Sequence, residues 1–335
     1  MREKERKFPY FYKLLIALAV FAFVFIYAMV SGAAETTFSD VWKALFTDES
    51  GGKLSILREI RFPRELAAIF VGAGLSAAGA IMQGMTRNPL ADPGLLGLTA
   101  GANAALALTL AFIPGANYFV IMGACFAGAA AGAMMVMAIG ASQKGGFSPF
   151  RIVLAGAAVS AFLFAIAEGL SIYFKLSKDV SMWTAGGMAG TTWTQLQLVI
   201  PSITVGILIA ILLSKQLTIL SLSEEVAVGL GQRTGQIKAI LFIVIIILTG
   251  AAVALAGNMA FAGLMVPHIV RWIVGTDYRY ILPMSAIGGA VFMLLADTAA
   301  RLINAPYETP VAAVISILGL PFFLYIVHKG GRAFT

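Results

Sequence analysis

The sequence predicts an all-α polytopic membrane protein with about ten transmembrane helices. Sixty per cent of its 335 residues are hydrophobic and only 12% are charged, whereas a soluble domain has about half and about a quarter. The apolar residues gather into segments close to the ~20 residues that cross a bilayer. Short polar joints separate these segments. This composition argues against a soluble enzyme and against a disordered chain.

The first apolar segment follows a basic N-terminus. Arg2, Lys4, Arg6 and Lys7 precede an apolar run over residues 14–30. This run is longer than the ~7–15 residues of a signal-peptide core, so we expect a retained membrane anchor. The small residues 31–34 keep a cleaved signal peptide as the alternative.

Nine further apolar segments complete the predicted bundle. They cover residues 65–85, 94–113, 118–141, 149–173, 193–213, 237–256, 259–274, 281–302 and 309–328. We therefore expect residues 1–335 to form a single transmembrane domain. Residues 1–13 are expected to be cytoplasmic, and the longer polar joint over residues 214–237 is expected to be a second cytoplasmic segment.

The distribution of positive charge predicts which side the ends occupy. With both ends inside, 15 Lys and Arg residues lie on the inner side and 8 on the outer side. This bias follows the positive-inside rule and favours an N-in/C-in orientation. Arg58, Arg61 and Arg64 run against the rule, because all three fall on the outer side within seven residues.

Glycine spacing predicts closely packed helices. Gly97 and Gly101, Gly128 and Gly132, and Gly186 and Gly190 are each four residues apart, a spacing that lets membrane helices approach closely.

A weak internal similarity is consistent with an inverted repeat. Gly79 and Pro89 have the same spacing as Gly257 and Pro267, on segments of opposite predicted direction. Chance similarity in so biased a composition is the alternative.

Few ionisable residues lie within the predicted spans. Glu168, His268 and Asp297 are functional candidates because charge inside a membrane is costly. Asp297 and Arg301 are spaced i, i+4 and are expected to pair on one helix. A proton-coupled secondary transporter that uses Glu168, His268 and Asp297 remains the alternative function.

Sequence motifs for common membrane-enzyme chemistry are missing from the printed chain. It contains no Gly-x-x-x-x-Gly-Lys-Ser/Thr phosphate loop and no His-Glu-x-x-His zinc motif, and it has two histidines. We expect neither catalysis nor a resident cofactor or metal, so any ATP hydrolysis must take place in another chain.

The joint between the sixth and seventh segments predicts a short cytoplasmic helix. Ser221 and Glu224 fit a capping box that begins a helix, and Gly229 and Gly231 are suited to its end. We expect a helix from Ser221 to Gly231. An ordinary surface loop is the alternative.

Several motifs resemble those of the FecCD/BtuC-like permease family of ABC importers for iron-siderophores, haem and cobalamin. They begin with Arg61-Phe-Pro-Arg64 and Gly79-Ala-Ile-Met-Gln-Gly84 and continue with the run from Asn88 to Gly97 and Leu222-Ser-Glu224. The family-motif positions in the chain are Asn88, Pro89, Leu90, Ala91, Pro93, Gly94, Pro267 and His268. The resemblance extends over nearly the whole chain from about residue 58.

The resemblance implies an importer subunit with no enzymatic activity of its own, in a bacterial plasma membrane. The implied partners are a second permease subunit, identical or homologous, two cytoplasmic ATPases and an extracytoplasmic substrate-binding protein. This type II importer assembly would carry an iron-siderophore, haem or cobalamin. The resemblance does not identify the individual substrate.

The resemblance also implies roles for individual residues. Arg61, Arg64 and Arg301 match positions where acidic residues of a binding protein dock, and Arg58 is an added candidate. Guanidinium groups suit this role because they hold carboxylates bidentately. The implied ATPase-coupling residues are Ser221, Glu224, Glu225, Ala227, Leu230 and Gly231. Ser223 departs from the family pattern, which usually has glycine there, but serine is expected to be tolerated.

Overall fold

The computed structural model describes residues 9–32, 36–49, 51–141, 149–176, 180, 183, 186–305 and 307–330. Over these residues every regular element is a helix and no strand occurs, which confirms the all-α prediction. Most of the predicted cytoplasmic N-terminal segment, including Arg2, Lys4, Arg6 and Lys7, lies outside the described residues.

Each of the ten predicted apolar segments contains a helix. These helices are α1 (Tyr10–Val30), α4 (Phe62–Thr86), α5 (Leu98–Phe112), α6 (Tyr118–Ala141), α7 (Pro149–Tyr173), α9 (Trp193–Leu212), α12 (Thr234–Ala256), α13 (Ala262–Val274), α14 (Tyr278–Ile303) and α15 (Val311–Gly330). In the described part of the chain, eight helices are long and apolar enough to cross a membrane, whereas α5 and α13 are shorter. The protein is thus polytopic, and the count of ten spans and the N-in/C-in orientation stay predictions.

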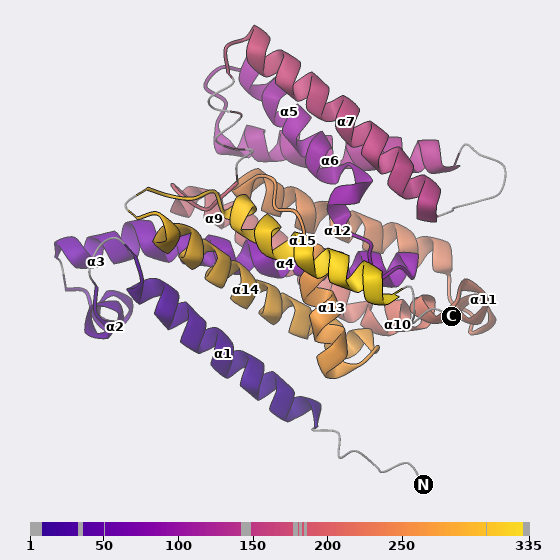
Figure 1. The fold of residues 1–335 in the computed structure, drawn as a ribbon, viewed down its shortest axis with the longest axis horizontal. Coiled ribbons are helices and arrows are strands. Elements are labelled where there is room, and N and C mark those ends of the chain that lie inside the picture. Colours follow the sequence, from indigo (N-terminus) through magenta and orange to yellow (C-terminus); the bar gives the residue numbers. More distant parts are fainter. Residues whose placement is uncertain are drawn as a thin grey trace.

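Short elements lie at the two ends of the bundle. One end holds α2 (Phe38–Phe46), α3 (Gly52–Ile56) and a π-helical turn, η1 (Leu57–Arg61), that leads into α4. The opposite end holds α10 (Ser214–Leu222) and α11 (Glu224–Gly229). Figure 1 shows that α1 begins and α15 ends toward this second end. We call the two ends the α2 end and the α11 end.

Helix α4 is the buried centre of the bundle and runs antiparallel to α14. Arg64 near the start of α4 bonds Asp297 near the end of α14. A Cβ atom at Gly72 would lie 2.1 Å from the carbonyl oxygen of Gly289, and one at Gly84 would lie 2.8 Å from the ring of Tyr278. Small residues thus let the two backbones approach closely along their length.

Two of the three predicted glycine pairs pack helix against helix. A Cβ atom at Gly101 would lie 2.0 Å from the carbonyl oxygen of Gly128, and one at Gly132 would lie 2.3 Å from that of Gly97. These contacts join α5 to α6 and confirm the prediction there. Gly186 and Gly190 do not pack helices, because both precede α9 with positive φ angles of 71° and 74°.

The paired glycines of the predicted inverted repeat have different surroundings. Gly79 lies within α4, where an added Cβ atom would be 1.8 Å from the carbonyl oxygen of Gly263 on α13. Gly257 instead ends α12 with a φ angle of 73°. These two positions therefore do not support the repeat, which stays a prediction.

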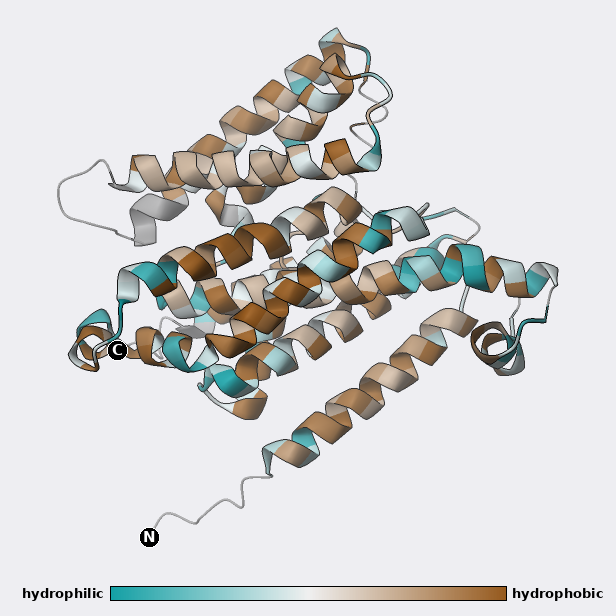
Figure 2. Ribbon diagram, turned by 180° about the vertical axis from the view of Figure 1, so that it is seen from behind, coloured by the Kyte–Doolittle hydropathy of each residue, from teal (hydrophilic) through white to brown (hydrophobic). Residues whose placement is uncertain are grey.

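Apolar side chains cover the outside of the bundle. Figure 2 shows hydrophobic residues along most of the helix lengths, with hydrophilic residues mainly near the helix ends. Only 17% of the most apolar 18-residue stretch of α1 is buried against the rest of the chain. Large exposed residues such as Phe11, Ile16 and Phe23 run along α1. Since water does not favour so much exposed apolar surface, lipid must surround these helices.

Candidate functional site

Five charged side chains meet between α4, α14 and the loop before α15, at the α2 end. We call Arg64, Glu65, Asp297, Arg301 and Glu308 the arginine–carboxylate cluster. Arg64 forks onto Asp297, with Nε 2.9 Å from Oδ2 and Nη2 2.9 Å from Oδ1. Its remaining Nη1 donates to Oε1 of Glu308 at 2.5 Å. Arg64 is therefore fully engaged within the chain.

Arg301 forms the second half of the cluster. Its Nη2 donates to Oε1 of Glu65 at 2.5 Å. Its Nε lies 3.1 Å from Oδ2 of Asp297, so the predicted i, i+4 pair between Asp297 and Arg301 is confirmed. The side chains of Glu65 and Asp297 are fully buried. Buried charges of this kind are tolerated only because each has a partner.

Arginines also cap the ends of α1 and α2. Arg61 donates to the carbonyl oxygens of Met29 and Val30, at 2.7 and 3.1 Å. Arg58 donates to the carbonyl oxygen of Ala44 at 2.9 Å, and also to the carbonyl oxygens of Lys43, Thr47 and Glu49. The last carbonyls of a helix lack partners within it and carry the negative end of its dipole, so guanidinium groups satisfy them well.

These contacts give a structural reason for the arginines that run against the positive-inside rule in the predicted orientation. Arg61, Arg64 and Arg301 are each less than 10% exposed, and all three bind groups of the same chain. In this arrangement they do not display a free guanidinium to an outside partner. The exposed member of the cluster is Glu308, whose side chain is 49% exposed.

The α11 end differs from the helix predicted over Ser221 to Gly231. The chain forms two helices there, because Ser223 adopts an extended conformation between them. The predicted capping residue was wrong: the Ser223 hydroxyl accepts the N–H of Val226, while Ser221 donates to the carbonyl of Thr218. Ser223 needs no positive φ angle, so serine fits where the family usually has glycine.

Other features of this segment match the sequence prediction. Gly231 has a φ angle of 76° just after α11, as expected for a glycine that closes a helix. Glu224 pairs with Nζ of Lys238 at 2.7 Å. This hydrogen bond lowers the pKa of the Glu224 carboxyl below its ordinary value. Ala227 is buried, whereas Val226, Val228 and Leu230 are exposed. Helix α11 thus presents apolar side chains outward.

Hydrogen bonds connect α10 to the start of α14. The Thr218 hydroxyl accepts the N–H of Tyr278 at 2.9 Å and lies 3.2 Å from Oδ1 of Asp277. Arg271 of α13 donates to the Tyr278 hydroxyl and to Oε1 of Gln83 on α4, both at 3.1 Å. The α11 end is therefore attached to the same two central helices that meet at the arginine–carboxylate cluster.

The family-motif run from Asn88 to Gly97 builds the turn between α4 and α5. Arg87 ends α4 in the left-handed conformation, and the Asn88 side chain accepts the N–H of Leu90 at 2.9 Å. Asp92 then accepts the N–H of Gly94 at 2.7 Å and caps the short helix η2 (Pro93–Leu96). Turn chemistry of this kind accounts for the residue types in the motif.

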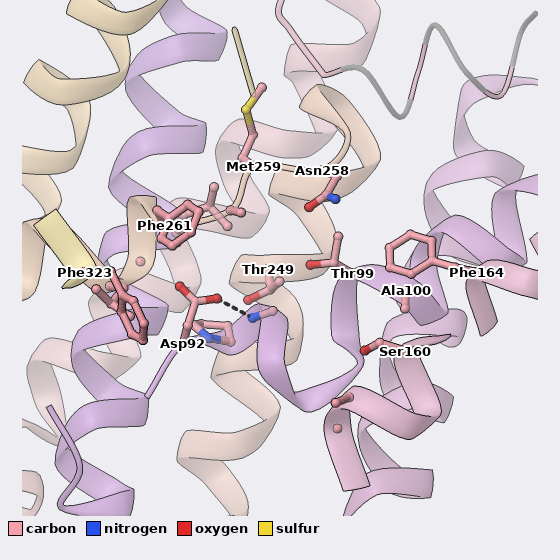
Figure 3. Close-up of a pocket in the computed structure, with 18 of the residues that line it drawn as sticks. Asp92, Thr99, Ala100, Ser160, Phe164, Thr249, Asn258, Met259, Phe261 and Phe323 are labelled. Atoms are coloured by element: carbon pink, nitrogen blue, oxygen red, sulfur yellow. Dashed lines mark hydrogen bonds between the residues drawn. The ribbon is translucent and has the colours of Figure 1, made fainter. Parts of the chain in front are cut away.

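This turn borders a cavity of about 460 Å³. Side chains from α4, α7, α12, α15 and the segment before α13 complete its lining, which is largely apolar. Figure 3 shows Phe164 and Phe323 on opposite sides, with the Asp92 carboxylate and the Thr249 hydroxyl between them. The Thr249 hydroxyl is buried without a hydrogen-bond partner. The cavity can therefore hold a mostly apolar group that also offers hydrogen bonds.

The three residues of the proton-relay alternative have separate surroundings. Asp297 is held by Arg64 and Arg301. His268 packs against the rings of Trp272 and Phe322, and Glu168 lies exposed on α7. These contacts favour structural roles for His268 and Asp297 over a shared relay.

Sequence reasoning missed several residues of these sites. Glu65 and Glu308 were not selected, although Glu65 adjoins Arg64 within a predicted span. Asp92 was not among the family-motif positions selected, although it lies within the run from Asn88 to Gly97, which was the available signal. Thr218 carried no sequence signal, because its partners lie some sixty residues away.

Comparisons with known proteins give one consistent result. The family model described as the FecCD transport family matches residues 19–329. The iron(3+)-hydroxamate import system permease protein FhuB of Bacillus subtilis is 45% identical over 302 residues, which cover 90% of this chain and 79% of that protein. The Fe(3+)-citrate import system permease protein YfmD of the same species is 41% identical and covers 94% of both chains.

A solved structure has the same fold. It is described as an inward-facing conformation of a metal-chelate type ABC transporter, with a TM-score of 0.82. The match covers 94% of this chain and 98% of that chain at 24% sequence identity.

Proposed function

Because this chain belongs to the FecCD transport family, we propose that it is the membrane-spanning permease subunit of a bacterial ABC importer for an iron-siderophore-type substrate. The observation that carries the proposal is the family match over residues 19–329. The two relatives described above are named for iron(3+)-hydroxamate and Fe(3+)-citrate import. Both substrates are iron chelates, so an iron chelate is the substrate class we assign.

The permease works with separate partners. We propose two cytoplasmic ATPases, a second permease subunit and an extracytoplasmic binding protein. The chain itself carries no phosphate loop, so the energy must come from another subunit. We place residues 1–335 in the inner membrane as a single domain with both ends in the cytoplasm. The α11 end is then cytoplasmic and the α2 end faces outward.

The coupling segment over residues 214–237 receives the motion of the ATPases. Helix α11 offers the exposed side chains of Val226, Val228 and Leu230 to a partner surface. Its motion would pass through α10 and the Thr218 contacts to α14. Among the predicted coupling residues, Glu224, Glu225 and Leu230 suit contact with an ATPase, whereas Ser221, Ala227 and Gly231 shape the segment.

Docking of the binding protein at Arg64 requires an exchange of partners. Asp297 occupies one edge of the Arg64 guanidinium, and Glu308 occupies the remaining Nη1. We propose that a carboxylate of the binding protein replaces the half-exposed Glu308. Arg58, Arg61 and Arg301 would then support docking by holding α1, α2 and the cluster in place.

Copurification combined with transport tests this function. The chain, solubilised gently from its native membrane, is expected to bring down a nucleotide-hydrolysing subunit and a second permease. For the uptake assay, the complex is placed in vesicle membranes, with the binding protein on the side of the α2 end. These vesicles should take up a ferric hydroxamate only when ATP is present on the side of the ATPases. Uptake by the chain alone, driven by a proton gradient, would instead establish the secondary transporter.

A further inference from the structure

The short helix α2 has three distinct faces. Consecutive residues of an α-helix are rotated by about 100°, which sorts its nine residues into three arcs. One arc packs on the protein and holds Val41 and Ala44. A second arc is polar and holds Ser39, Asp40 and Lys43. The third arc is apolar and exposed, and it holds Phe38, Trp42, Leu45 and Phe46. We call this third arc the aromatic arc.

The chain fixes α2 firmly while leaving the aromatic arc uncovered. Val41 is buried among Met29, Leu54 and Leu57. The Thr37 hydroxyl and the Asp40 carboxylate form a capping box at the start of α2, and Arg58 binds the carbonyls at its end. Trp42 and Phe46 contact each other, with ring centroids 4.4 Å apart, but Trp42 remains 56% exposed.

The position of α2 identifies what covers this arc. Figure 1 shows α2 nearly end-on, whereas α1, α4 and α14 run across the view, so α2 lies crosswise to the bundle. It follows directly from α1, a helix whose exposed Phe23 and Tyr27 face lipid near the same end. Aromatic side chains gather where a bilayer meets water. A helix with one apolar and one polar face lies in that boundary plane.

We infer that α2 is an interfacial helix whose aromatic arc enters the lipid headgroup and acyl-chain boundary at the α2 end. Its polar arc faces water, and the arc that holds Val41 and Ala44 rests on α1, α3 and η1. The occupant of the aromatic arc is thus membrane lipid. Because Arg58 and Arg61 hold α2 and α1 in place, this anchor would fix the depth at which the arginine–carboxylate cluster sits relative to the membrane surface.

Site-directed fluorescence in vesicles tests this inference. A bimane label is attached at Trp42→Cys or Lys43→Cys in the full-length chain, with Cys125→Ala as background. These neighbouring positions point about 100° apart, so Lys43 is the matched control. The vesicles contain phosphatidylcholine and phosphatidylglycerol. One series carries phosphatidylcholine brominated near the headgroup end of its chains, and another is exposed to iodide in the buffer.

The expected result is a reversal between the two positions. Brominated lipid should quench the label at position 42 at least about two-fold more strongly than the label at position 43, and iodide should show the opposite preference. Strong iodide quenching at both positions would overturn the inference, because the arc would then face water. Protection at position 42 from both quenchers would overturn it too, because a protein partner would cover the arc. A label at Leu45→Cys repeats the test should Trp42→Cys not fold.

Discussion

The two ends of the α4–α14 pair are built from different interactions. At the α2 end, the arginine–carboxylate cluster joins the helices through buried ion pairs, with Glu65 and Asp297 fully buried. At the α11 end, part-buried hydrogen bonds join Thr218 of α10 to Asp277 and Tyr278 at the start of α14, and Arg271 of α13 bridges Tyr278 to Gln83 of α4. Removing one partner of a buried pair costs about 3–5 kcal/mol, whereas a typical hydrogen bond contributes about 0.5–1.5 kcal/mol.

This difference suits a subunit that is driven from one side. An end held by buried charges resists rearrangement, because any movement that separates them leaves a charge without a partner. An end held by exchangeable hydrogen bonds can follow a moving partner at small cost. Under the proposed function, we therefore interpret the α2 end as the fixed end of the subunit and the α11 end as the end that adapts to the proposed ATPases.

The largest expected effect comes from breaking the fixed end. Asp297→Asn keeps the shape of the side chain but leaves Arg64 and Arg301 without their shared negative charge. We expect a loss of about 3–5 kcal/mol of stability, measured by thermal unfolding of the purified chain. Glu308→Gln is the control, because Glu308 is half exposed and should contribute about 0–1 kcal/mol. Equal melting of both variants would contradict a fixed end.

A smaller effect is expected from a close helix contact that lies between the two ends. Gly79→Ala places a Cβ atom 1.8 Å from the carbonyl oxygen of Gly263, so α4 and α13 must separate. The expected loss is about 1–3 kcal/mol in the same unfolding assay. Gly169→Ala on α7 is the matched control, since nothing lies within 4 Å of its added methyl group. The contact would be unimportant if both variants melted together.

Charge reversal at the adaptable end should separate stability from function. Glu224→Lys with Glu225→Lys breaks the exposed pair with Lys238 and removes two carboxylates from the first turn of α11. Exposed charges of this kind contribute little to stability, so the melting temperature should change only slightly. Both carboxylates point to a partner surface under the proposed function, so ATP-driven uptake should fall while ATP hydrolysis by the complex continues. Assays of uptake and phosphate release on one preparation give both values. If uptake still accompanied ATP hydrolysis as in the unmodified complex, α11 would have no role in coupling.

The smallest expected effect is a pH dependence at the start of α14. Hydrogen bonds from Arg279 hold the pKa of the Asp277 carboxyl below its ordinary value. Its stabilising contribution is therefore complete above the ordinary pKa of about 4 and is lost as the pH falls through the lowered value. The protection of amides at the start of α14, expressed relative to their intrinsic exchange rates, should fall only in this acidic range. Asp277→Asn should abolish that acid dependence. If the variant still lost protection at low pH, another titrating group would be responsible.

The sequence could predict the helices better than their connections. Apolar length alone located every long helix, because a lipid environment requires each backbone polar group to be paired within a helix. The i, i+4 spacing also predicted the contact between Asp297 and Arg301. The break at Ser223 was missed because Ser221 and Ser223 both fit a helix cap, and only tertiary packing decides between them.

The candidate sites were harder to predict because their partners are distant in sequence. Arg64 and Glu308 are 244 residues apart, and Arg61 binds a carbonyl 32 residues away. Sequence periodicity cannot predict such pairs, because it shows only which residues share a face of one helix. The resemblance to a family suggested what the arginines do between proteins, but it did not reveal how they are used within the chain.

Distance measurements between spin labels test the central claim most directly. One pair, at Ile60→Cys and Ile303→Cys, reports on the α2 end, and a second pair, at Val228→Cys and Tyr280→Cys, reports on the α11 end. Both are measured in the complex with its ATPases, with and without ATP. We predict that the distance at the α11 end changes while the distance at the α2 end stays the same. An equal or larger change at the α2 end would contradict a permease fixed at one end and driven from the other.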